Sequence, residues 1–146
     1  MSALAAYLTI VIGGDLTASQ AGFACGESWP LCPGGLIPDL SQPGVIIEFT
    51  HRVVAFVTSL LILVMLILAF LWFRTDRRIV SLSVTTMALL FAQVLLGGVT
   101  VQSNLNPLIV TAHLALGTAT FAAALVLAVV LSLSRSPATL STGSPS

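Results

Sequence analysis

The chain has 146 residues, of which 57% are hydrophobic and only 7% are charged. Soluble domains have about 25% charged residues, so this chain could not cover a water-exposed surface, and it is too apolar for intrinsic disorder. Its five basic and five acidic residues give a formal net charge of zero, which argues against a nucleic-acid partner. The composition therefore predicts a multi-pass protein of the cell membrane, in contact with membrane lipid.

The first predicted helix covers residues 2–17, an apolar stretch that is short and contains Asp15 near its end. A secretory signal peptide normally opens with a basic segment, and this stretch has none. We therefore expect a first membrane-crossing helix here, with a cleaved signal peptide as the alternative interpretation.

A loop of residues 18–45 follows and contains both cysteines, Cys25 and Cys32. The arginine distribution described below predicts that this loop is external, in an oxidising compartment, so we expect a disulfide between the two. The pair would serve either as a staple for a loop rich in Gly and Pro or as a redox-active pair. Its spacing is not that of zinc ligands.

Three longer apolar stretches are predicted to cross the membrane: 46–73, 79–101 and 108–133. A helix of about 20 residues spans the hydrocarbon core of a bilayer, and a backbone in lipid must form its hydrogen bonds within its own helix. With the first helix, they predict an all-α integral membrane protein. Its single domain, residues 1–133, would be a bundle of four transmembrane helices built from two helical hairpins.

The arginines predict the orientation, because positively charged loops are retained on the cytoplasmic side. Arg74, Arg77 and Arg78 lie between the second and third predicted helices, and Arg135 follows the fourth. Both termini are therefore expected in the cytoplasm and the long first loop outside. Residues 134–146, rich in Ser, Thr and Pro, predict a disordered cytoplasmic tail.

Both histidines of the chain, His51 and His113, lie near the start of a predicted helix that runs from outside to inside. They are therefore expected at the same depth, roughly 6–8 Å below the outer mouth of the bundle. Ionisable groups in a membrane are costly and usually functional. Paired imidazoles in a four-helix bundle suit the two axial positions of a haem iron. We favour haem over zinc, for which the bundle offers at most His51, His113 and Glu48, and over two structural hydrogen bonds.

Two charged residues flank the first of these histidines. Glu48 lies three residues before His51, on the same helix face, where a carboxylate suits proton transfer. Arg52 follows His51 and could pair with Glu48 or with a haem propionate, since a guanidinium binds carboxylates in a fork. An interfacial ion pair that anchors the helix end is the alternative for both residues.

The two predicted hairpins share a pattern. Gly13 and Gly14 precede one external loop and its histidine helix, and Gly97 and Gly98 precede the other. Such glycines allow close approach of helices. Gln93, the one strongly polar residue of the third predicted helix, is expected to form an interhelical hydrogen bond.

Three segments of the chain resemble the haem A synthase family. Residues 25–38, CGESWPLCPGGLIP, resemble the cysteine-bearing first external loop of that family. Residues 48–52 match its Glu-x-x-His-Arg signature. Residues 95–117 resemble its third loop and the histidine-bearing fourth helix. The resemblance covers roughly residues 10–125, but the usual member has eight helices in two homologous halves. This chain resembles the compact half-length form, corresponding to the catalytic N-terminal half.

The resemblance implies an oxidoreductase that converts a methyl group of haem O to formyl, giving haem A for terminal oxidase assembly. His51 and His113 would be the axial ligands of the haem iron, and Arg52 would help to bind the cofactor. Glu48 would be the essential acidic residue. Cys25 and Cys32 would be the loop pair, structural or redox-active. The bound haem would be haem O, haem A or haem B.

The partners follow from the same resemblance. Haem O would be the substrate. The resemblance suggests haem O synthase and a terminal oxidase as protein partners, whereas the electron donor is not evident in the sequence. Because one chain offers one histidine pair, a homo-oligomer would have to supply a second site. Asp15 and Thr17 stand where many members of the family have an apolar residue and a basic one. This departure argues against a propionate-binding group at these two positions. A b-type cytochrome and a haem carrier without turnover are the alternative functions.

Overall fold

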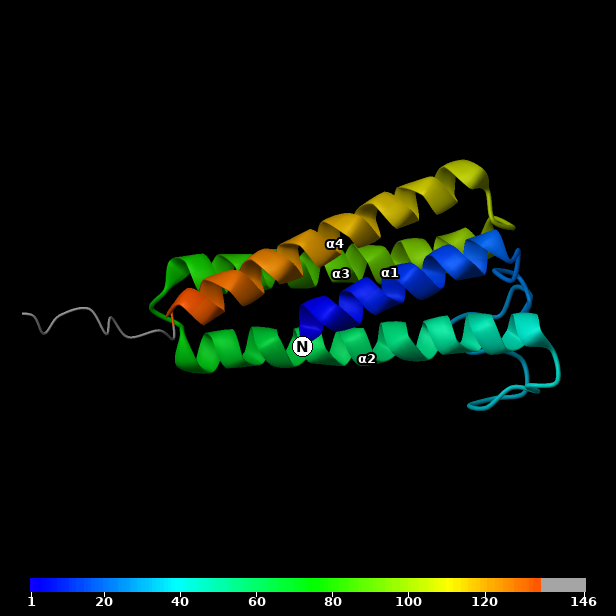
Figure 1. The fold of residues 1–146 in the computed structure, drawn as a ribbon, viewed down its shortest axis with the longest axis horizontal. Helices are drawn as coiled ribbons and strands as arrows, with labels where there is room; N and C mark the ends of the chain where they lie inside the picture. Colours follow the sequence, from blue (N-terminus) through cyan, green and yellow to red (C-terminus); the bar gives the residue numbers. More distant parts are fainter. Residues whose placement is uncertain (135–146) are drawn as a thin grey trace, which may run out of the picture.

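The computed structural model describes residues 1–134 as four helices without strands: α1 (Ser2–Ala18), α2 (Pro43–Trp72), α3 (Arg77–Gln102) and α4 (Pro107–Ser134) (Figure 1). The predicted all-α membrane bundle is confirmed. The predicted disordered tail falls almost entirely on residues 135–146, which lie outside the described residues.

The helices begin at residues whose chemistry suits a first turn. Pro43 opens α2, three residues before the expected start at residue 46, because proline lacks the N–H that a first turn leaves unpaired. The Asp76 carboxylate accepts hydrogen bonds from the backbone N–H groups of Arg78 and Ile79 and caps α3. Pro107 opens α4 after Asn106, whose side-chain oxygen accepts from Leu108 N.

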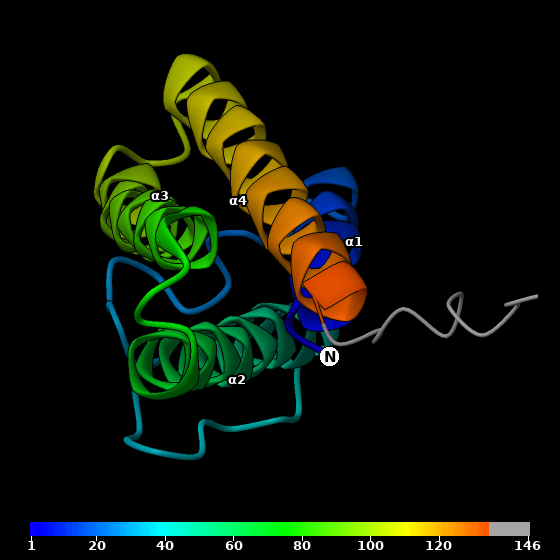
Figure 2. The same cartoon turned by 90° about the vertical axis from the view of Figure 1, so that its left-hand side faces the viewer.

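Each helix packs against two neighbours, in the order α1, α2, α3, α4 and back to α1. The view along the bundle shows this ring, with α1 and α4 side by side (Figure 2). The chain therefore forms two antiparallel hairpins, α1–α2 and α3–α4, as the sequence predicts. Both hairpins place their connecting loops at the same end of the bundle (Figure 1).

Three helices, α2, α3 and α4, are long and apolar enough to cross a membrane, and the chain is a multi-pass membrane protein. The first helix is shorter, with 17 residues, which corresponds to about 26 Å at 1.5 Å per residue. Its first residue lies part-way along α2, and the helix runs from there to the loop end (Figure 1). Its full crossing, and the side on which each end lies, stay predictions.

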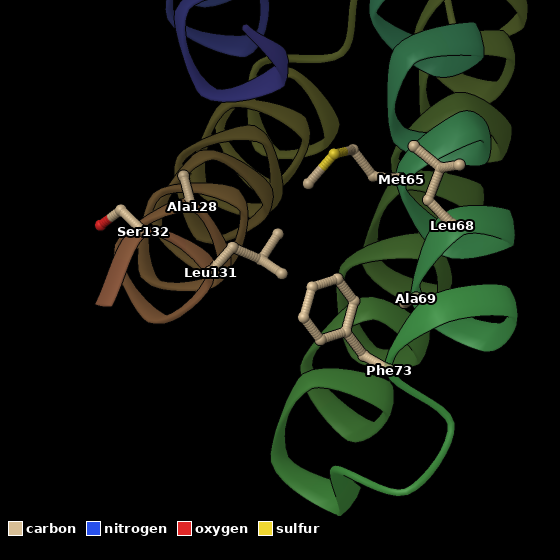
Figure 3. Close-up of a pocket in the computed structure, with 7 residues that line it drawn as sticks. All are labelled: Met65, Leu68, Ala69, Phe73, Ala128, Leu131 and Ser132. Atoms are coloured by element: carbon tan, nitrogen blue, oxygen red, sulfur yellow. The ribbon is translucent and has the colours of Figure 1, made fainter. Parts of the chain in front are cut away.

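The end of the bundle that α1 does not reach contains the packed apolar cluster of Ala69, Ile79 and Leu127. Beside it lies a pocket of about 290 Å³, lined on one side by residues 65–69 of α2 and by Phe73 just after this helix, and on the other side by residues 128–132 of α4. Figure 3 shows that apolar side chains line most of it. Met65, its nearest lining residue on α2, follows His51 by 14 residues, or about 21 Å along a helix. This pocket is therefore remote from the histidines.

Candidate functional site

Each histidine faces a glycine of the neighbouring helix in its own hairpin. A Cβ atom added to Gly13 of α1 would lie 3.0 Å from Cε1 of His51 on α2. A Cβ atom added to Gly97 of α3 would lie 3.2 Å from Cε1 of His113 on α4. Both distances are tighter than ordinary van der Waals contact, so a larger residue would displace the imidazole. The glycine pairs noted in the sequence thus contribute one glycine each to seating a histidine.

The two histidines lie at the same level of the bundle. One turn below them, a Cβ atom added to Gly117 of α4 would lie 2.9 Å from Gln93 Nε2 of α3 and 3.9 Å from Ile10 Cγ1 of α1. Gly117 follows His113 by four residues, and Ile10 precedes Gly13 by three. Three helices therefore converge just beneath both imidazoles, and the fold brings the predicted pair together at one depth.

In the described part of the chain, the buried side-chain nitrogen and oxygen atoms without a hydrogen-bond partner all lie in this site. Within residues 1–134 they are His51 Nδ1, His113 Nδ1 and Gln93 Oε1. Such an atom typically costs about 1–3 kcal/mol of folding free energy, so each calls for an explanation. Gln93 Nε2 lies 3.3 Å from His113 Nε2, which is the interhelical contact that the sequence predicts for this glutamine.

The donor set fits a haem iron. Porphyrin supplies four nitrogen ligands, so two axial positions of a haem iron remain for protein ligands, and neutral imidazole is a common one. The bundle presents two imidazoles at one level, each lying where its neighbouring helix has a glycine. Zinc usually takes at least three protein ligands, and the described part of the chain contains no group of three or more His, Cys, Asp or Glu that could hold a metal ion.

Glu48 lies one turn before His51 and is only 2% exposed. Its Oε2 accepts a hydrogen bond from the backbone N–H of Cys25 at 2.7 Å. Its Oε1 pairs with the guanidinium of Arg52, one turn later on α2. The carboxylate is therefore held between the external-loop backbone and an arginine. The sequence suggested the pair with Arg52, whereas it gave no signal for the contact with Cys25.

Arg52 connects α2 to the same loop. Its Nη1 donates to the backbone carbonyls of Ser28 at 2.8 Å and Pro30 at 3.0 Å. Of the two partners expected for Arg52, the structure shows the pair with Glu48. Binding of a haem propionate by Arg52 stays a prediction. Cys25 and Cys32 are joined by the predicted disulfide and are buried. The loop segment 25–32 is thus closed on itself and fixed to α2 by Glu48 and Arg52.

Two further contacts fix the long loop, one to α3 and one to the α3–α4 turn. The indole ring of Trp29 lies against α3, so that a Cβ atom added to Gly98 would be 3.2 Å from its Cδ2. The side chain of Leu105, in the α3–α4 turn, lies in the same way beside Gly22. The sequence indicated that Gly98 permits close approach, but it gave no signal for the partner of either glycine.

Comparisons with known proteins identify the family of the chain. The sequence model of the COX15-CtaA family, described as cytochrome oxidase assembly protein, matches residues 1–145. The chain is 35% identical over 132 residues to "Heme A synthase" of Lysinibacillus sphaericus, covering 90% of this chain and 43% of that protein. It is 32% identical over 127 residues to "Heme A synthase" of Geobacillus thermodenitrificans, covering 86% and 40%.

A third relative, "Heme A synthase" of Bacillus pumilus, is 34% identical over 131 residues, which cover 85% of this chain and 41% of that protein. The chain thus spans less than half the length of these relatives. No solved structure matches it. The family match extends over nearly the whole chain and includes both histidines, both cysteines and Glu48, and the chain belongs to the COX15-CtaA family of cytochrome oxidase assembly proteins.

Proposed function

We propose that the chain is a haem A synthase, an oxidoreductase that converts a methyl group of haem O to formyl for terminal oxidase assembly. The observation that carries this proposal is the pair of imidazoles at the same depth of the bundle, each facing a glycine of the neighbouring helix. The family membership and the names of the relatives support the reaction. When bound, the haem supplies the oxidative chemistry at its iron and its ring edge.

The residues of the chain would divide the remaining work. His51 and His113 would hold the iron from two sides, since they come from α2 and α4 at one level. Gly13 and Gly97 would leave room for the two imidazole rings, which a larger residue at either position would displace. The apolar side chains of the surrounding helices would exclude water from the haem.

Glu48 would be the acidic residue of the reaction. It lies on α2 one turn from His51, and its two oxygens are held by the Cys25 amide and by Arg52. Such fixed donors keep a carboxylate in one orientation. We propose that a Glu48 oxygen accepts a proton released during oxidation of the haem methyl group.

The histidine pair also bears on the partners. Residues 1–146 contain one such pair, and we propose that another copy of the chain, in a homo-oligomer, provides a second haem site. Dioxygen would be the oxidant of the methyl group, and the electrons that reduce its second oxygen atom to water would come from an external donor. Haem O synthase and a terminal oxidase are the proteins with which a haem A synthase would exchange substrate and product.

A second candidate is a haem-binding protein without turnover, such as a b-type cytochrome or a haem carrier. The hydrogen bonds of Glu48 favour this candidate. One carboxylate oxygen holds the loop directly through Cys25 N, and the other pairs with Arg52, which also holds the loop. Electron transfer or haem carriage would need the histidines but no acidic residue.

The test is to co-express the chain with a haem O source and to chromatograph the haems extracted from purified protein. We expect haem A or its hydroxylated intermediate in the wild type and neither in a control with both His51→Ala and His113→Ala. Haem O and haem B alone, bound by folded wild-type protein, would overturn the synthase proposal and leave the haem-binding alternative.

A further inference from the structure

The two hairpins differ at one position next to the histidines. Thr9 on α1 and Gln93 on α3 each precede the glycine that faces a histidine by four residues. The Thr9 hydroxyl is engaged elsewhere, with Ala5 O at 2.9 Å and with Thr58 Oγ1 at 2.9 Å. Gln93, with its longer side chain, reaches Nε2 of His113 at 3.3 Å. Among the hydrogen bonds of residues 1–134, no side chain bonds the ring of His51 in this way.

The space for this glutamine is provided by α4. A Cβ atom added to Gly117 would lie 2.9 Å from Gln93 Nε2, so even an alanine there would displace the amide. The other atom of the amide, Oε1, is buried and has no partner. The side chain is therefore placed against His113 without being held by any other described group.

The contact between Gln93 and Nε2 of His113 competes with metal binding by the same nitrogen. With the ring in its Nδ1–H tautomer, Nε2 has one lone pair, which can accept the N–H of Gln93 or bind a metal ion. It cannot do both at once. The Gln93 contact is therefore available to His113 only when its Nε2 is not bound to iron.

We propose that Gln93 is a positioning residue that receives His113 when this histidine leaves the haem iron. His113 would then be the exchangeable axial ligand and His51 the permanent one. The proposal rests on the proposed haem site. It addresses a difficulty of that site, because a haem with two histidine ligands has no open position for a small molecule until one of them is released.

The test uses full-length protein loaded with haem B, reduced with dithionite and mixed with carbon monoxide in a stopped-flow spectrometer. Carbon monoxide binds only where a histidine has left, so its association rate below saturation reports that release. We expect Gln93→Leu to slow association roughly three- to tenfold, the range of one net hydrogen bond. The matched control is Thr9→Val in the other hairpin, for which we expect a change of less than about twofold.

A second pair of variants separates positioning from a general effect on the pocket. In a His113→Ala background the released ligand no longer exists, so adding Gln93→Leu should leave the association rate unchanged. Slowing in that background would overturn the proposal. Gln93→Asn, whose amide is too short to reach Nε2, should be slow like Gln93→Leu in the presence of His113.

Other outcomes are equally decisive. Unchanged rates in both glutamine variants would overturn the proposal, and so would loss of haem from both, because Gln93 is assigned no part in retaining bound haem. Failure of folded wild-type protein to bind haem B would instead contradict the proposed haem site itself.

Discussion

The carboxylate of Glu48 accepts a hydrogen bond from the backbone amide of Cys25 at 2.7 Å. This contact joins the helix that carries His51 to the loop that carries the disulfide. The same carboxylate pairs with Arg52, which in turn donates to two loop carbonyls. A change at Glu48 therefore alters both the acidic group beside the histidine and the attachment of the loop, and experiments must separate the two effects.

Glu48→Gln is the variant that separates them. Its amide oxygen can still accept from Cys25 N, whereas the charge and the ion pair with Arg52 are lost. We expect haem to remain bound and haem A formation to stop, as measured by haem chromatography. Glu48→Ala should also stop haem A formation and should lower the unfolding free energy by about 1–3 kcal/mol more, because the Cys25 amide loses its acceptor. Substantial haem A in Glu48→Gln would remove the proton-acceptor role.

Substitution of either histidine should change the haem spectrum. His51→Ala or His113→Ala removes one axial ligand, so the absorption bands of the purified, haem-loaded protein should shift or disappear. The control is Gln93→Leu, which leaves both ligands in place and should retain a spectrum of two-histidine type. Spectra that match the wild type in both histidine variants would contradict the axial-ligand assignment.

The glycines that face the histidines offer a test of the pocket geometry. Gly13→Ala and Gly97→Ala would put a Cβ atom 3.0 Å and 3.2 Å from the imidazoles, so we expect reduced haem content per chain. Gly14→Ala is the matched control, because nothing lies within 4 Å of its added Cβ atom. Alanine there should raise helix stability by up to about 1 kcal/mol. Equal haem content in all three variants would show that these glycines do not position the rings for haem.

Removal of the disulfide should separate its two interpretations. If the pair is a staple, the double variant Cys25→Ser, Cys32→Ser should lower the unfolding free energy by about 2–3 kcal/mol and keep measurable haem A formation. We expect this result, since Glu48 and Arg52 also hold the loop. Loss of haem A with full haem content and unchanged stability would instead identify the pair as redox-active.

The helices and their order could be predicted from the sequence because apolar stretches of sufficient length leave the chain few choices in lipid. The common depth of the two histidines could be predicted in the same way. Each lies near the start of a helix that begins at the loop end of its hairpin, and the rise per residue of a helix is fixed. The start of α2 at Pro43 was missed by three residues, because the hydropathy of the stretch does not mark its first turn.

The sequence by itself thus determined a membrane bundle of two hairpins with a histidine at the loop end of each. Only the tertiary structure decided which groups meet there: Gly13 with His51, Gly97 and Gln93 with His113, and Glu48 with Cys25. The physical reason is the range of the interactions. Helix formation depends on local hydrophobicity and backbone hydrogen bonding, whereas Cys25 and Glu48 are 23 residues apart and meet only because the loop folds back onto α2. Likewise, the partner of each imidazole depends on how the helices are rotated against one another, which side-chain packing across the whole bundle sets.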